Sequence, residues 1–144
     1  MRVFLDSSAL VKRYYEEPGS DQVQELMDSA THLIASALCV LEVTSALSRR
    51  RRLGQIDQRE LDWTRETLFE DLSRMDVIPI ADSILDEALG MIDRRSVTTL
   101  DSIQLATALR GSPDLFVCSD RSLLQAARSE GLVVLDPASR DTQA

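Results

Sequence analysis

Four acidic residues that are far apart in the sequence stand where short apolar segments meet helical ones. They are Asp6, Glu42, Asp101 and Asp120. A set of carboxylates without histidine or cysteine suits Mg²⁺ or Mn²⁺ better than Zn²⁺, because hard cations prefer oxygen ligands. If the fold gathers these four side chains, they can hold a divalent ion whose chemistry is hydrolysis.

The elements that must position them alternate along the chain. The sequence predicts strands over residues 2–5, 32–36, 76–80, 115–118 and 132–135, and helices over 8–17, 20–29, 38–52, 57–75, 82–93, 99–110 and 121–130. This alternation predicts an α/β fold with three layers, α/β/α, around a short, mostly parallel sheet. One domain is expected over residues 1–136, followed by a polar tail over 137–144. Pro79 places its strand at an edge or an end.

Asp6 follows the first predicted strand, and Asp120 follows the strand at 115–118. Sites in open parallel sheets form beyond the carboxyl ends of strands, where the strand order reverses, and neighbouring strands would bring the two side chains together. Each residue also precedes a helix, so the alternative is a simple N-cap. Two such positions on strands distant in sequence favour a shared site.

Glu42 and Asp101 lie inside predicted helices. Glu42 faces away from the side that carries Val43 and Leu47, and its alternative role is a solvated glutamate. Asp101 stands in the first turn of its helix, where Thr98 and Asp101 resemble a capping box. The rest of that helix is almost wholly apolar and must be buried. A cation would compensate a carboxylate at its margin.

The charge of the chain argues at first against nucleic acid. Its 16 basic and 24 acidic residues give a net charge of −8, whereas affinity for polyanions comes from Lys and Arg on phosphates. A negative protein can still bind RNA when its acids line a metal pocket and its contact face is basic. Arg49 lies on the Glu42 side of its helix and is a candidate phosphate clamp, with Arg13 and Lys12 as further candidates. The alternative for the run 49–52 is a solvated helix end that suits the helix dipole.

Two cysteines, one tryptophan and the lack of membrane or signal segments give further expectations. Cys39 and Cys118 lie in apolar runs and are expected to be buried free thiols. Trp63 falls opposite the apolar stripe of its helix, as an exposed anchor for a partner or as a local packing residue. No apolar run reaches the ~18 residues of a membrane helix. The first residues also lack the form of a signal peptide, so the expected location is the cytoplasm.

Four segments together resemble the motifs of PIN domains of the VapC toxin type. They are residues 4–20 with Asp6, 35–47 with Glu42, 99–109 with Asp101 and 116–132 with Asp120, in family order and at family spacing over nearly the whole chain. The resemblance implies a PIN-like fold, a pocket of these four acids for Mg²⁺ or Mn²⁺, and cleavage of RNA. It also implies inhibition by a small cognate antitoxin and a homodimer.

The resemblance assigns supporting positions as well. Ser119 stands where the family keeps a Ser or Thr that organises the pocket, and Ser7 occupies a position often held by Thr. Gln104 departs from the many relatives that have His there, and we expect it to affect substrate contacts rather than metal binding.

Other enzymes with acids at strand ends fit the sequence poorly. A haloacid-dehalogenase-like phosphatase would need a second Asp two residues after Asp6, where Ser8 stands. A receiver domain would need a lysine late in the chain, whereas the single lysine is Lys12. The remaining alternative is a non-catalytic PIN-fold module that binds RNA or protein.

Overall fold

The computed structural model describes residues 1–139 of the chain. Its centre is a five-stranded parallel sheet with the order β3-β2-β1-β4-β5. The strands are β1 (Arg2–Leu5), β2 (His32–Ser36), β3 (Asp76–Ile78), β4 (Leu115–Val117) and β5 (Val134–Leu135). From β1 the chain adds β2 and β3 on one side and β4 and β5 on the other. The strand order therefore reverses between β1 and β4, where a crevice opens at their carboxyl ends.

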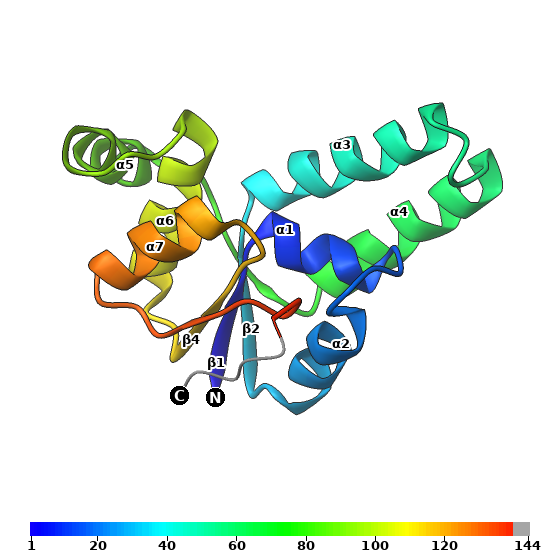
Figure 1. Cartoon of the computed structure of the whole chain (residues 1–144), viewed down its shortest axis with the longest axis horizontal. Helices are drawn as coiled ribbons and strands as arrows, with labels where there is room; N and C mark the ends of the chain where they lie inside the picture. Colours follow the sequence, from blue (N-terminus) through cyan, green and yellow to red (C-terminus); the bar gives the residue numbers. More distant parts are fainter. Residues whose placement is uncertain (140–144) are drawn as a thin grey trace.

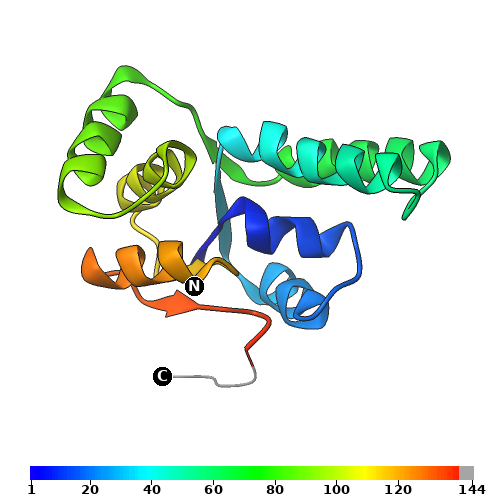
Figure 2. The ribbon, with the colours of Figure 1, turned by 45° about the horizontal axis from the view of Figure 1, so that its top comes forward.

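Helices cover both faces of this sheet (Figures 1 and 2). One layer holds α1 (Ser7–Leu10), the 3₁₀ turn η1 (Val11–Arg13), α2 (Ser20–Ser29), α3 (Leu38–Arg52) and α4 (Gln58–Leu72). The other holds α5 (Asp82–Arg94), α6 (Thr99–Gly111) and α7 (Arg121–Ser129). The predicted three-layer α/β/α fold is confirmed. Among residues 1–139, none of the helices combines the length and apolarity needed to cross a bilayer.

Alternate residues of the central strands pack into two separate hydrophobic cores, one on each face of the sheet. Val3 and Leu5 pack into the core beneath α1–α4, whereas Phe4 packs into the core beneath α6 and α7. There Phe4 stacks on Phe116 of β4, with the ring centroids 5.5 Å apart. Successive side chains of a strand point to opposite faces, and here both faces are covered. The double burial explains why these strands are continuous apolar runs in the sequence.

The first predicted helix is wrong in its length. The sequence predicts a helix over 8–17, but α1 ends at Leu10 and the 3₁₀ turn ends at Arg13. Tertiary contacts outweigh helix propensity, because Glu17 leaves the helical path to form ion pairs with Lys12 at 3.1 Å and Arg50 at 2.9 Å. Gly19 then turns the chain with a φ of 94°, and a Cβ there would meet the carbonyl oxygen of Pro137 at 2.5 Å. Only glycine meets both demands.

The other boundaries shift by a few residues. The helix predicted over 57–75 ends at Leu72, and the strand predicted over 76–80 ends at Ile78, before Pro79. That strand, β3, lies at the edge of the sheet, as predicted. Both cysteines are buried free thiols, also as predicted. Of the predicted tail, Pro137 is buried against Gly19, and residues 140–144 lie outside the described part of the chain.

Candidate active site

Asp6 stands at the carboxyl end of β1 and is the N-cap of α1. Its Oδ2 accepts hydrogen bonds from the backbone N of Ser8 at 3.0 Å and from Ser8 Oγ at 2.6 Å. Its backbone N donates to the carbonyl of Val117 at 3.0 Å, which ties it to the end of β4. The residue is only 5% exposed. Asp6 therefore caps α1 and also lies where β1 and β4 end side by side.

Asp120 holds the matching position after β4, as the N-cap of α7. Its Oδ1 accepts from the backbone N of Leu123 at 2.9 Å, which leaves Oδ2 outside the cap. Ser8 joins the two strand ends, because its Oγ donates to Asp6 and accepts from the backbone N of Ser119 at 2.9 Å. Ser8 was not among the predicted site residues. The one sequence feature that could have found it is a hydroxyl two positions after a capping Asp.

Glu42 reaches the crevice from α3 and is held on one oxygen. Its Oε1 accepts hydrogen bonds from Ser7 Oγ at 2.9 Å and from Gln104 Nε2 at 2.8 Å. Gln104 Nε2 also lies 2.8 Å from Ser7 Oγ, so residues of α1, α3 and α6 meet in one network. Neither bond to Glu42 uses Oε2. Ser7, a supporting residue implied by the family resemblance, thus hydrogen-bonds Glu42.

Gln104 has a different position from the one expected. It is 1% exposed, so it contacts Glu42 and Ser7 rather than the open face where a substrate would lie. Its Oε1 is buried and has no hydrogen-bond partner within residues 1–139. An amide buried in an apolar helix needs partners, and the network supplies them only to its nitrogen.

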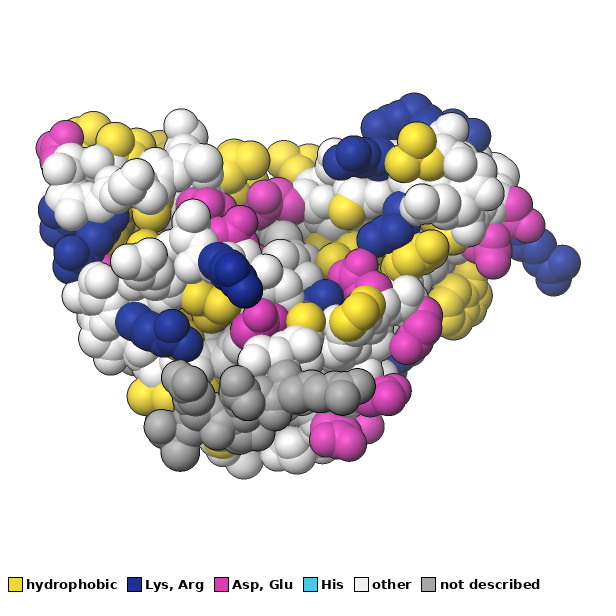
Figure 3. All heavy atoms as spheres, in the orientation of Figure 1, with side chains coloured by type: hydrophobic (Ala, Val, Ile, Leu, Met, Phe, Trp, Pro, Cys, Tyr) yellow, Lys and Arg dark blue, Asp and Glu magenta, His cyan; other side chains and the backbone are white. Residues whose placement is uncertain are grey.

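Asp101 completes the set from the first turn of α6. Its backbone N is capped by Thr98 Oγ1 at 3.3 Å, as the capping-box pattern predicted. Partial burial raises the pKa of its carboxyl, the Thr98 contact opposes this, and the negative charges of Asp120 and Glu42 raise the pKa further. Figure 3 shows acidic side chains gathered in the hollow between α3 and the layer of α5–α7.

The electrostatics of Asp6 connect it to the same group. Burial raises the pKa of Asp6 from 3.8 to about 6, and the negative charge of Glu42 adds to the rise, while the Ser8 hydrogen bonds oppose it. Asp6 and Asp101 each sense Glu42, and Asp101 also senses Asp120. The charge of Glu42 thus acts on both Asp6 and Asp101, and the charge of Asp120 acts on Asp101, which links the four predicted carboxylates electrostatically.

The donor set fits a hard divalent cation. The four acids offer only oxygen, and a bound cation would relieve the repulsion that raises the pKa values of Asp6 and Asp101. As the side chains lie, no three His, Cys, Asp or Glu residues within 1–139 are grouped to hold an ion by themselves. Mg²⁺ does not need three, because it keeps several waters and binds through one or two carboxylates plus substrate phosphate.

The predicted phosphate contacts differ in their availability. Lys12 is buried and paired with Glu17, and Arg13 lies 3.3 Å from a carboxylate oxygen of Asp71. Arg49 is exposed and forms no ion pair with any residue of the described chain. It lies two turns beyond Glu42 on α3, so Arg49 is the best placed of the three candidates.

Comparison with known proteins decides the family. The PIN domain family model matches residues 3–129. The chain belongs to the PIN-domain family. It is also 33% identical over 138 residues to Ribonuclease VapC46 of Mycobacterium tuberculosis, covering 94% of this chain and 98% of that protein. The resemblance to PIN domains of the VapC toxin type that the sequence indicated is thereby confirmed.

Solved structures share the fold of this PIN domain. It superposes on the FitAcB structure from Neisseria gonorrhoeae with a TM-score of 0.72 and 16% identity, covering 94% of this chain and 97% of that one. A toxin–antitoxin complex from Klebsiella pneumoniae gives a TM-score of 0.69 and 15% identity, with the same coverage of 94% and 97%. At 15–16% identity, the likeness to these two structures shows a shared fold and no more.

Proposed function

We propose that this PIN domain is the endoribonuclease toxin of a toxin–antitoxin pair, hydrolysing RNA phosphodiester bonds with Mg²⁺ or Mn²⁺. The observation that carries the proposal is the arrival of four carboxylates from four elements at the β1/β4 crevice, with linked electrostatics. A relative named as a ribonuclease, 33% identical over 94% of the chain, supports the RNA substrate. Since its substrate is RNA, we infer that the protein acts in the cytoplasm.

Each acid has a distinct part in the proposed chemistry. The divalent ion, bound through Asp6 and neighbouring carboxylates, would neutralise phosphate charge and lower the pKa of water. Asp6 is the central ligand because it is the most buried of the four and closest to both strand ends. Glu42 is held at Oε1 by Ser7 and Gln104, so Oε2 is free to orient a water and accept its proton. Asp101 and Asp120 line the more open side, where they complete the pocket around the phosphate.

The alternative is a PIN-fold module that binds RNA or protein without catalysis. In a pocket without catalytic function, nothing would offset the burial of Asp6 beside Glu42, because that burial opposes ionisation of Asp6 and lowers the stability of the fold. The intact acid set therefore favours the enzyme.

The decisive assay incubates cellular RNA with the protein, with and without Mg²⁺ or Mn²⁺. We expect cleavage by the wild type only with metal and none by Asp6→Asn. Asp86→Asn, on the exposed face of α5, removes the same charge away from the crevice and should cleave like the wild type. Cleavage that survives Asp6→Asn in protein free of contaminating nuclease would refute the site, and absence of cleavage by the wild type would favour the binding module.

We also infer two protein partners, a second copy and a small antitoxin. Leu85, Leu89 and Ile92 expose 45–63% of their surface along one stripe of α5, which suits a homodimer interface. Trp63 is 60% exposed, which favours its role as an anchor over local packing, and the toxin–antitoxin complex with the same fold supports the antitoxin. Light scattering should report a dimer that Leu89→Glu splits and that Leu53→Glu, at the exposed end of α3, leaves intact.

A further inference from the structure

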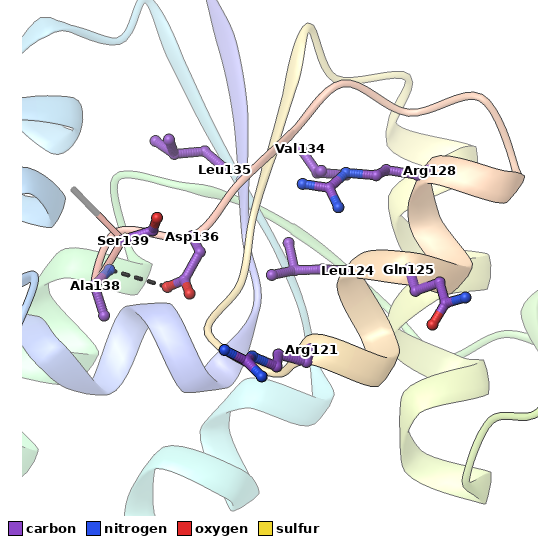
Figure 4. A pocket seen from close by; sticks show the side chains of 9 residues that line it. All are labelled: Arg121, Leu124, Gln125, Arg128, Val134, Leu135, Asp136, Ala138 and Ser139. Carbon is purple, nitrogen blue, oxygen red and sulfur yellow. Dashed lines mark hydrogen bonds between the residues drawn. The ribbon is translucent and has the colours of Figure 1, made fainter. Parts of the chain in front are cut away.

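A groove of about 690 Å³ lies beside the acidic crevice, between α7 and the chain that leaves β5. Figure 4 shows its lining. Arg121, Leu124 and Arg128 project from one side of α7. The opposite wall is formed by Val134, Leu135, Asp136, Ala138 and Ser139. The groove begins next to the site because Arg121 directly follows Asp120.

The two arginines are available to a ligand. Both are exposed, and neither forms an ion pair or a side-chain hydrogen bond with another residue of the part described, 1–139. By contrast, the neighbouring Arg94 and Arg95 are both occupied by Glu130, at 3.0 and 2.8 Å. In a chain of net charge −8, two unpaired guanidinium groups on one wall make a local positive surface. Figure 3 shows basic side chains over α7 beside the acidic ones.

The spacing of the groove residues suits a nucleotide better than a lone anion. Arg121 and Arg128 are seven residues apart on one helix, or about 10.5 Å along its axis. Figure 4 shows both pointing across α7 in the same direction, with Leu124 between them. Two phosphates could lie on the two guanidinium groups, and the sugar and base between them would lie over the half-buried Val134 of β5.

The opposite wall carries one negative charge. Asp136 lines the groove, and its Oδ1 accepts from Ala138 N at 2.9 Å and from Ser119 Oγ at 3.3 Å. One carboxylate does not cancel two guanidinium groups, so the groove keeps a net positive charge among its ionised side chains. Asp136 repels phosphate and accepts hydrogen bonds, which directs the phosphates to α7 and a ribose hydroxyl or base amine to the β5 side.

We propose that this α7 groove binds one nucleotide of the RNA strand beside the cleavage site, with its flanking phosphates on Arg121 and Arg128. The inference rests on the proposed ribonuclease function and adds a substrate subsite to it. Arg121 follows a site carboxylate, so a strand entering the crevice would continue along α7.

The test is binding of a fluorescent single-stranded RNA decamer as a function of salt, with Mg²⁺, in an Asp6→Asn background that keeps the RNA intact. The groove variant carries Arg121→Gln and Arg128→Gln. The matched control carries Arg59→Gln and Arg110→Gln, which removes the same charge from exposed sites on α4 and α6. We expect the groove variant to bind at least about ten times more weakly, and its slope of log K against log salt to be shallower by about 1.4, or ~0.7 per lost phosphate contact.

Equal slopes for the groove variant and its control would overturn the subsite and leave the groove to another ligand, such as an acidic peptide. Cleavage by the unmodified protein is measured separately. If the wild type cleaves RNA and the slopes are equal, only the subsite fails. If the wild type neither cleaves nor binds RNA, the proposed function fails with it.

Discussion

The two halves of the acidic site are built differently. In the inner half, Asp6, Ser7 and Gln104 are buried, and Glu42 is fixed by two hydrogen bonds. In the outer half, Asp101 is half-buried and Asp120 is exposed. Thr98 caps the backbone N of Asp101, and the Asp120 side chain caps the backbone N of Leu123. Burial penalises the ionised form of Asp6 and two hydrogen bonds fix Glu42, whereas Asp120 in the outer half is open to solvent. Under the proposed function, the inner half would set the position of the ion, and the outer half would face the substrate.

The strongest test of this difference is to replace one carboxylate in each half by the uncharged amide. Glu42→Gln should lower kcat by about three powers of ten, or about 4 kcal/mol, because it removes a fixed carboxylate next to the reacting phosphate. Asp120→Asn keeps the helix cap, since Asn caps as well as Asp. Its loss in kcat should be about ten times smaller than that of Glu42→Gln. Single-turnover cleavage of a defined RNA measures both. Equal losses would show that the two halves are equivalent.

The pH dependence of stability tests the inner half without catalysis. The pKa of Asp6 is about 6 in the folded chain and 3.8 when unperturbed. The folded state therefore holds this proton more tightly, and its stabilising effect is complete below pH ~4 and lost as pH rises through about 6. In EDTA, the unfolding free energy of the wild type should fall by about 3 kcal/mol relative to Asp6→Asn between these limits.

Urea denaturation of both proteins at a series of pH values gives this difference directly. Asp86→Asn serves as the control and should track the wild type. A constant difference between wild type and Asp6→Asn across pH 4–7 would mean that Asp6 is not penalised by burial.

Gln104 tests whether the inner half depends on the residue that positions Glu42. Gln104→Leu should lower kcat about tenfold with little change in KM, because it releases Glu42 Oε1 without touching the substrate. Gln104→His restores a hydrogen-bond donor at this position and should recover most of the loss. Activity that is insensitive to Leu but reduced by His would indicate that only the volume of the side chain matters.

The smallest expected effect concerns Arg49, outside both halves. Arg49→Gln should raise KM for RNA a few-fold and leave kcat unchanged, because a single exposed phosphate contact contributes little. Arg59→Gln is the matched control on α4. A loss in kcat rather than KM would place Arg49 at the reacting phosphate instead of along the strand.

Sequence reasoning recovered the parts of the site that follow from local patterns. Asp6 and Asp120 were predictable because strand ends and helix starts are visible in the chain. Glu42 and Asp101 needed the family resemblance, since a helical face does not reveal which other helix it meets. Ser8 and the position of Gln104 were not recovered, because both roles arise from contacts between segments about 100 residues apart. The short first helix was missed for the same reason, as its end depends on the tertiary partners of Glu17.

The central claim is that the four acids form a metal site with Asp6 at its centre. Isothermal titration of the protein with Mn²⁺ at pH 6, in two buffers of different ionisation heat, measures affinity and proton release together. Since the pKa of Asp6 is about 6, the account predicts binding by the wild type with release of about half a proton from this group. It predicts greatly weakened binding without that release for Asp6→Asn. Equal affinity and equal proton release for the two proteins would contradict it.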